Sequence, residues 1–391
     1  MRSPDARHFV LDPALIFLNH GSFGACPKTI LDAHTALRLE WERDPLGFFD
    51  GLEERIDAAR DEAAALVGAD PRGFVFVRNA TMGVNAVLQS FPIAPGDALL
   101  TTDHAYAACK NALDHWAHRA GAEVVVAKIP FPIAHEDEAL AAIEAAVTPK
   151  TKLAMIDHVT SPTGIVLPIE RIVRRLEDRG VAVLVDGAHA PGMVPLAIDR
   201  MAPSFYTGNF HKWICAPKGA AMLWVREDRR ARMHPTSISH GYTARTRRGA
   251  LQDEFDWTGT DDFSPWLLVG QAARTMAEMA GSMSALMESN RALALEARRI
   301  LSGKLGIVPP APESMIATLV AMPLAPRTDD GSGRDPLYDA LFARNFRVPV
   351  MPWPGPRDRL LRISAQRYNH VSEYEALADA VLELRASGMR V

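Results

Sequence analysis

Short apolar runs that alternate with helical stretches are the feature that most constrains the fold of this chain. Seven such runs lie within the first 225 residues, at 73–77, 97–102, 122–129, 152–157, 181–186, 204–208 and 220–225. Helical periodicity separates most of them. Strands that alternate with helices in this way form a mostly parallel sheet with helices on both faces. We therefore expect an α/β fold whose large domain holds a mostly parallel seven-stranded sheet covered by helices.

The pattern changes after about residue 263. Two long helical stretches, at 264–281 and 284–304, precede strand-like runs at 314–322, 346–351 and 360–364 and a last helix at 372–387. This succession predicts a smaller C-terminal α+β domain. We expect an N-terminal arm at 1–20, a large domain at 21–262 and the small domain at 263–391.

The composition is that of a globular protein, with 391 residues, 48% hydrophobic and 23% charged. The net charge is −4, and no cluster of Lys and Arg suggests a nucleic-acid or membrane partner. The three cysteines, Cys26, Cys109 and Cys215, are too widely spaced to indicate a disulfide framework or a metal site. The N-terminal segment has no apolar signal region, and no run approaches the ~20 residues that span a bilayer. We therefore expect a cytoplasmic enzyme.

Lys212 and Asp186 together indicate a cofactor. Asp186 ends the apolar run VAVLVD, and Lys212 follows in the loop GNFHKW, before the strand AAMLWV. A lysine amine forms a Schiff base with the aldehyde of pyridoxal 5′-phosphate (PLP), and a carboxylate keeps the pyridine nitrogen protonated. These two residues are therefore the minimal PLP site. Lys218, closer to the strand, is the weaker alternative for the lysine.

A phosphate site is expected where the segment RNATMGVNAVLQSF begins a helix. Ala80 and Thr81 lie at its start, where backbone N–H groups lack partners inside the helix and the helix dipole favours an anion. The alternative is that Thr81 is only an N-cap.

Other polar or aromatic residues follow neighbouring strands. Tyr106 and Ser161 stand at the ends of two of them, the edge where ligands of open α/β sheets bind. Tyr106 can stack on the ring and Ser161 can reach its phenolic oxygen, although a packed tyrosine and an ordinary Ser-Pro turn are the alternatives. His189, three residues after Asp186, can hydrogen-bond the cofactor or substrate, although a lone histidine is more often structural.

The substrate residues expected from the sequence are fewer. Arg362 lies on a strand of the small domain, and its planar fork suits a substrate carboxylate, unless it pairs with a structural aspartate. Asn19, His20 and Arg43 are further candidates near the site entrance.

The order of these segments resembles the class V aminotransferase family of fold-type I PLP enzymes, and within it the isopenicillin N epimerase-like branch. The segments that carry the resemblance span residues 18–369 and include LNHGSFGACP, WERDPLGFF, RNATMGVN, SPTGIVLPI, VDGAHAPG, GNFHKWICAPKGAAML, GTDDFSPW and LRISAQRYN.

The resemblance implies a role for each matching residue. Lys212 would hold the cofactor, Asp186 would contact the pyridine nitrogen, Tyr106 would stack on the ring, and His189 would lie near its O3′ side. Arg362 would bind the substrate carboxylate. The phosphate would be held by Ala80, Thr81, Asn209 and His211, with Asn209 standing where many relatives have serine. A loop of the partner subunit with Gly259 and Thr260 would also reach the phosphate, which implies a homodimer.

The reaction is less constrained than the cofactor. The family includes epimerases, transaminases, cysteine desulfurases and carbon–sulfur lyases. A desulfurase uses a cysteine shortly before the substrate arginine, and residues 216–391 contain none. We therefore expect an isomerase that epimerises an amino acid through an α-carbanion, with a β-lyase acting on a cysteine-derived substrate second and a transaminase third. A PLP-binding protein without turnover, or an unrelated α/β module, is the alternative from another class.

Overall fold

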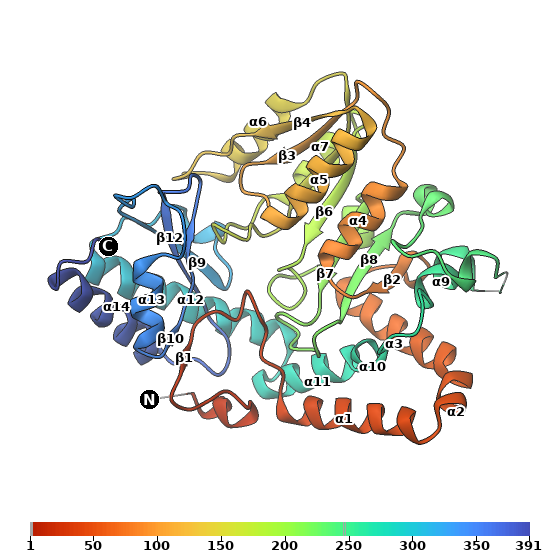
Figure 1. The fold of residues 1–391 in the computed structure, drawn as a ribbon, viewed down its shortest axis with the longest axis horizontal. Helices are drawn as coiled ribbons and strands as arrows, with labels where there is room; N and C mark the ends of the chain where they lie inside the picture. The colour runs from red at the N-terminus through yellow and green to blue at the C-terminus, as the bar shows by residue number, and fades with distance from the viewer. Residues whose placement is uncertain (1–2, 245, 247) are drawn as a thin grey trace.

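The structure is a computed structural model that describes residues 3–244, 246 and 248–391 (Figure 1). Its centre is a seven-stranded sheet in which six strands run in one direction and β8 runs against them. In spatial order the strands are β2 (Phe74–Val77), β8 (Ala221–Val225), β7 (Phe205–Asn209), β6 (Ala182–Gly187), β5 (Thr151–Asp157), β3 (Ala98–Thr102) and β4 (Glu123–Ala127). Each coincides with one predicted run, so the mostly parallel seven-stranded sheet is confirmed.

Buried apolar side chains on both faces of the sheet explain why helices cover it. Along β6, Val183 and Val185 pack into one apolar cluster, whereas Leu184 between them packs into another. Successive side chains of a strand point to opposite faces, so the strand needs cover on both sides. One face is covered by α4 (Ala80–Ser90), α5 (Ala107–Ala120) and α9 (Ala250–Asp256). The other is covered by α3 (Leu52–Val67), α6 (Glu136–Ala146) and α7 (Ile169–Glu177).

The C-terminal part is built on a second, antiparallel sheet, as the succession of elements predicted. Its strands, in spatial order, are β11 (Val350–Pro352), β12 (Arg359–Ser364) and β9 (Leu319–Leu324). Its helices are α12 (Met283–Leu305), α13 (Pro336–Ala343) and α14 (Val371–Ala386), which gather at the left of Figure 1. The expected N-terminal arm joins this part, because β1 (Ile16–Phe17) pairs in parallel with β10 (Phe346–Arg347).

The helices at the lower edge of Figure 1 connect the two parts. They are α1 (Lys28–Arg43), α2 (Pro45–Asp50), α10 (Ser264–Leu267) and α11 (Val269–Ala280), while the short α8 (Ile198–Met201) precedes β7. Both α10 and α11 follow the boundary predicted at residue 263, yet they contact α3 of the large domain. The division into 21–262 and 263–391 therefore stays a prediction. Among the described residues, no helix is long and apolar enough to span a membrane.

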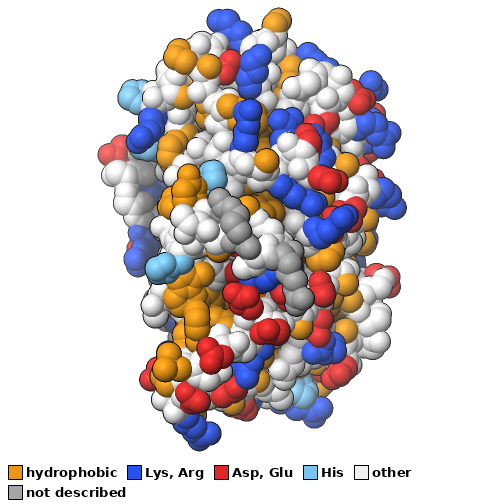
Figure 2. Space-filling view, turned by 90° about the vertical axis from the view of Figure 1, so that its right-hand side faces the viewer, with side chains coloured by type: hydrophobic (Ala, Val, Ile, Leu, Met, Phe, Trp, Pro, Cys, Tyr) orange, Lys and Arg blue, Asp and Glu red, His pale blue; other side chains and the backbone are white. Residues whose placement is uncertain are grey.

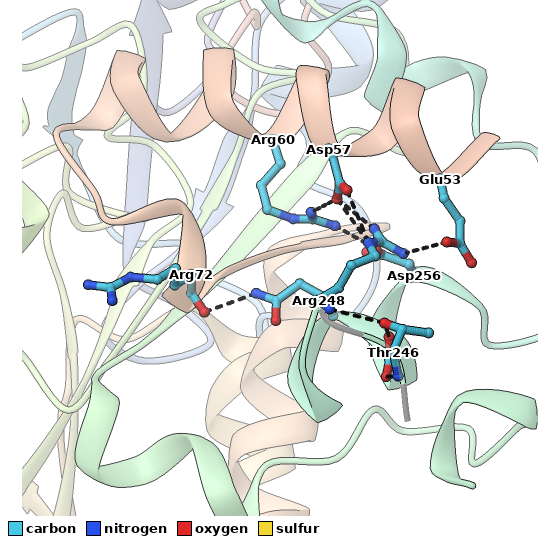
Figure 3. A network of polar contacts seen from close by, with 9 residues as sticks. Glu53, Asp57, Arg60, Arg72, Thr246, Arg248 and Asp256 are labelled. Carbon is cyan, nitrogen blue, oxygen red and sulfur yellow. Dashed lines mark hydrogen bonds and ion pairs between the residues drawn. The ribbon is translucent and has the colours of Figure 1, made fainter. Parts of the chain in front are cut away.

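Ion pairs join α3 to α9, which lie at the right of Figure 1, and Figure 3 shows this network from close by. Arg60 of α3 and Arg248 both pair with Asp256, and Arg248 also contacts Asp57 at 2.7 Å. Asp256 is buried, and a buried carboxylate is stable only beside a positive charge. The guanidinium groups of Arg60 and Arg248 supply that positive charge.

A hollow of about 520 Å³ lies beside this network, and Phe49 and Trp257 are among its lining residues. On this side of the molecule, acidic side chains stand close to apolar ones (Figure 2).

Candidate active site

A cavity of about 660 Å³ lies where the parallel strands end, between the large sheet and β12 of the small domain. It draws residues from β5, β6, β7, the starts of α4 and α5, the loop after β7, and the N-terminal loop that holds Gly21 and Ser22. Ten residues predicted from the sequence line it, namely Ala80, Thr81, Tyr106, Ser161, Asp186, His189, Asn209, His211, Lys212 and Arg362. The fold therefore brings together side chains from positions 80 to 362.

Lys212 lies in the loop between β7 and β8 (residues 210–220), which is called the lysine loop below. Burial lowers the pKa of its amine to about 8, although the carboxylate of Asp186 acts in the opposite direction. Its Nζ lies 3.2 Å from Nε2 of His189. A lysine with this pKa is partly uncharged near neutral pH, which is the form that attacks an aldehyde. Lys218, the alternative lysine, instead donates a hydrogen bond to the Gly24 carbonyl at 3.0 Å.

Asp186 has a carboxylate oxygen without a hydrogen bond, and this oxygen tests whether the cavity fits PLP. The side chain is 2% exposed. Its Oδ1 accepts the Ala188 N–H at 3.0 Å, whereas Oδ2 is buried and has no partner among the described residues. A buried charged oxygen without a donor is costly, and the protonated ring nitrogen of PLP would supply both a donor and a positive charge. The residues present therefore fit this cofactor.

The first residues of α4 line the cavity. Asn79, and not Thr81, is the N-cap, and its Oδ1 accepts the Met82 N–H at 2.9 Å. The Ala80 N–H donates to Oδ1 of Asn209 at 2.9 Å. Thr81 is the second residue of the helix, where the backbone N–H has no partner inside the helix and favours an anion. This geometry suits the predicted phosphate position.

Two histidines of the site are neutral because they are buried. Burial lowers the pKa of His211 to about 4, and its Nδ1 lies 2.9 Å from the Ala220 carbonyl. Burial and the nearby Lys212 and Arg362 hold the pKa of His189 well below its usual range. The Trp213 indole N–H donates to Nδ1 of His189 at 3.4 Å, so the proton of the neutral ring belongs on Nε2, which faces Lys212.

Arg362 is a buried cation whose hydrogen-bond acceptors are all neutral. Burial lowers its pKa to about 10, but the guanidinium stays charged at neutral pH. It donates to the Ser161 carbonyl and, at 3.2 Å, to Ser161 Oγ, while Ser22 Oγ and Asn19 Oδ1 lie at 3.0 and 3.4 Å. No carboxylate pairs with it among the described residues, so the structural ion pair considered for Arg362 is absent there. A ligand carboxylate would complete this site.

Five residues predicted for the site do not line the cavity. His20 is fully buried below the lysine loop, where Nδ1 lies 2.8 Å from Tyr368 Oη and Nε2 lies 2.9 Å from the Lys212 carbonyl. Arg43 is an exposed residue at the end of α1. Gly259 and Thr260 follow α9, and neither lines the cavity of its own chain. Asn19 reaches the site only through its contact with Arg362.

The cavity also contains residues that the sequence reasoning missed. Asp157 ends β5 and is 2% exposed, as Asp186 is at the end of β6. The signal was present in the sequence, because both aspartates end an apolar run. Cys109 and Ser22 also line the cavity, and neither carries a signal in the sequence that distinguishes it from other residues of its type.

Known proteins resemble this chain over nearly its whole length. The chain is 34% identical to an isopenicillin N epimerase of Amycolatopsis lactamdurans over 96% of each chain. It is 31% identical to a putative L-cysteine desulfhydrase of Oryza sativa subsp. japonica, over 95% of this chain and 83% of that one. Among solved structures, a C-DES variant with glycine covalently linked to the PLP cofactor superimposes with a TM-score of 0.83 at 20% identity. That match covers 96% of this chain and 98% of the other.

The sequence model of class-V aminotransferases matches residues 48–322, which include Asp186 and Lys212. The fold is that of fold-type I PLP enzymes. The expected family, fold and cofactor are thereby confirmed, and this chain belongs to the class-V aminotransferase family of PLP-dependent enzymes.

Proposed function

We propose that this enzyme epimerises an amino acid at Cα, with β-elimination from a cysteine-derived substrate as the second candidate and transamination as the third. The observation that carries the amino-acid part is the convergence of Lys212, Asp186 and Arg362 on one cavity. Two of the three lack a partner among the described residues, because no carboxylate pairs with Arg362 and Oδ2 of Asp186 has no hydrogen bond. The likeness to an isopenicillin N epimerase over 96% of each chain supports the choice of epimerisation.

The cofactor supplies an aldehyde that condenses with amines and a ring that accepts electrons from Cα. The protein has to hold the substrate and move protons around it. Arg362 would bind the α-carboxylate with its fork, and Ser22 and Ser161 stand beside it to fix the orientation. Lys212, with a pKa of about 8, would take the Cα proton at its Nζ.

Epimerisation also needs a group that returns a proton to the opposite face. His20 lies outside the cavity, and its ring nitrogens contact Tyr368 and the Lys212 carbonyl. Tyr106 lines the cavity and is 44% exposed, so its phenol is accessible to a substrate. We therefore assign the second proton donor to Tyr106, with water as the alternative.

The second candidate shares these residues and differs only in the substrate. Elimination requires a leaving group on the β-carbon of the substrate. The similarity to relatives named as L-cysteine desulfhydrases supports a sulfur leaving group. A desulfurase that forms a persulfide on a cysteine near Arg362 is disfavoured, because no cysteine follows Cys215.

We also propose that the enzyme is a cytoplasmic homodimer. In this arrangement Gly259 and Thr260 of each subunit would reach the cofactor phosphate of the other.

Incubation in D₂O tests the reaction. An amino-acid panel would be scored together for Cα deuterium, chirality, pyruvate and sulfide, with Lys212→Ala as the inactive control. An epimerase should place deuterium at Cα of both stereoisomers at comparable rates and release no keto acid. Stoichiometric pyruvate and a sulfur product from a cysteine conjugate, with no inversion of any amino acid, would promote the lyase instead.

A further inference from the structure

Asp157 and Asp186 are neighbours at the bottom of the active-site cavity. They are register partners on the parallel strands β5 and β6, which lie about 4.8 Å apart in such a sheet. Their side chains therefore leave the same face of the sheet side by side. Both line the cavity and both are 2% exposed. The site thus contains two buried carboxyl groups, where the chemistry described above uses only one.

Each of the two groups has one oxygen without a partner. Oδ1 of Asp157 and Oδ2 of Asp186 are buried, and neither has a hydrogen bond within the described part of the chain. The backbone N–H groups of Tyr106 and Ser161 interact with the carboxyl group of Asp157. Tyr106 and Ser161 are themselves residues of the cofactor site, so Asp157 connects the start of α5 to the turn after β5.

We propose that Asp157 is a positioning residue of the cofactor site, which fixes Tyr106 and Ser161 and shares a single proton with Asp186, so that the pair carries one negative charge. One negative charge matches the single positive charge of a protonated ring nitrogen. Two adjacent buried carboxylates would repel each other, and one of such a pair stays protonated. A neutral Asp157 can still accept the two backbone N–H groups while its own O–H acts as a donor.

The electrostatic surroundings support this assignment. Burial holds the pKa of Asp157 well above its usual range, and the nearby Asp186 raises it further. The N–H groups of Tyr106 and Ser161 and the amine of Lys212 oppose the shift, but burial is the larger effect. Cys109 and Tyr206 also face the pair. Burial and both aspartates raise the pKa of the Cys109 thiol, and burial and Asp186 raise the pKa of the Tyr206 phenol.

The Asp157→Asn variant tests the shared proton, because asparagine has the shape and charge of the protonated acid. An aspartate with a raised pKa in the folded state stabilises that state below its unfolded pKa, and this contribution is lost as pH rises toward the folded value. The apo-protein should therefore lose about 2 °C more in Tm per pH unit than Asp157→Asn between pH 5 and pH 7. Cofactor affinity of the variant, measured by equilibrium dialysis, should stay within about threefold of the original, since one negative charge remains.

Asp103→Asn is the matched control. Asp103 follows β3 at the same edge of the sheet, but it does not line the cavity. Its variant should keep the cofactor affinity of the unaltered protein. Asp157→Ala, which cannot accept the N–H groups of Tyr106 and Ser161, should lose at least tenfold in cofactor affinity, whereas Asp157→Asn restores it.

Either of two results with the variants would overturn the proposal. Parallel Tm curves for Asp157→Asn and the unaltered protein would mean that Asp157 does not hold the proton. A tenfold loss of cofactor affinity in Asp157→Asn, without one in Asp103→Asn, would mean that Asp157 contributes a negative charge. If Asp157→Asn fails to fold, infrared spectroscopy of the unaltered apo-protein at pH 7 tests the shared proton. A protonated carboxyl group has a distinct C=O band, and the absence of this band would exclude the shared proton. The inference depends on the cofactor site alone, so it stands whichever reaction the substrate panel reveals.

Discussion

At the scale of single residues, burial sets the charge of almost every group in the site. It lowers the pKa of Lys212 to about 8, and it keeps His189 and His211 neutral. Burial also lowers the pKa of Arg362, but only to about 10, so the guanidinium stays charged at neutral pH. The site therefore contains one amine that is ready to react and one fixed cation that is ready to bind an anion.

The pKa of Lys212 predicts how fast the apo-protein captures its cofactor. Only the uncharged amine attacks an aldehyde, so the rate should rise with pH and level off above about 8. Stopped-flow absorbance of apo-protein mixed with PLP measures it, and borohydride reduction with peptide mapping identifies the labelled lysine. A label on Lys218, or a rate that still rises steeply above pH 9, would contradict the assignment.

Arg362 is predicted to bind the substrate carboxylate with both arms of its fork. Arg362→Lys keeps the charge but loses the paired geometry, so amino-acid binding should weaken by about 1.5–3 kcal/mol. Absorbance titration of the holoenzyme gives the Kd. A simple amine without a carboxylate is the control ligand, and its affinity should not change. Equal amino-acid affinity in both proteins would assign Arg362 to packing.

Ten of the residues predicted from the sequence line the cavity, and the others lie elsewhere for physical reasons. Asp186 and Lys212 were found because each lies at the end of an element where ligands gather. His20 was expected to bind substrate, but its fully buried ring contacts Tyr368, which is 348 positions away. Arg43 lies in a motif of the resemblance yet on an exposed helix end. Contacts over such separations depend on tertiary packing, which local sequence does not encode.

At the scale of elements, strand ends and the loops after them position the site. The seven strands could be predicted because each is a short apolar run, and the sheet then brings their carboxyl ends to one edge. The pairing of β1 with β10 could not be predicted, because two-residue strands have no periodicity. The N-terminal loop that follows β1 passes over the lysine loop at very short range. A Cβ at Gly24 would lie 2.3 Å from the His211 carbonyl oxygen and 2.7 Å from that of Lys212.

Gly24→Ala should therefore displace the lysine loop. The clash is with backbone atoms that cannot rotate away, so we expect at least a tenfold loss of PLP affinity and a lower Tm. Gly51→Ala is the matched control, because a Cβ there meets no atom within 4 Å and the backbone has an ordinary φ of −100°. Dialysis and thermal unfolding measure both variants. An affinity in Gly24→Ala equal to that in Gly51→Ala would show that the two loops move independently.

At the scale of the whole molecule, the outer end of the large domain presents apolar side chains that a second subunit would cover. Leu46 and Phe49 of α2 are 78% and 45% exposed, and Ile238 and Tyr242 are 54% and 51% exposed. Phe49 and Trp257 line the hollow beside α9, and Gly259 and Thr260 follow Trp257 directly. Exposed apolar groups that lie close together, as Phe49 and Trp257 do at this hollow, mark interaction surfaces. The surface is thus continuous with the loop predicted to enter the partner's site.

Subunit complementation tests this arrangement. Lys212→Ala removes the amine, and Thr260→Asp places a negative charge where the partner's phosphate would bind, on a residue that is exposed and outside its own cavity. If each site combines Lys212 of one subunit with Thr260 of the other, every site in either homodimer is defective. A mixed dimer then contains one site with both defects and one site with neither.

Unfolding and refolding an equal mixture of the two variants should therefore restore about a quarter of the original activity. Half of the dimers are mixed, and each mixed dimer has one intact site of two. The two variants refolded separately are the controls, and size-exclusion chromatography verifies that dimers form. If Thr260 instead served the cavity of its own chain, the mixed dimer would have one defect in each site, and mixing would restore nothing.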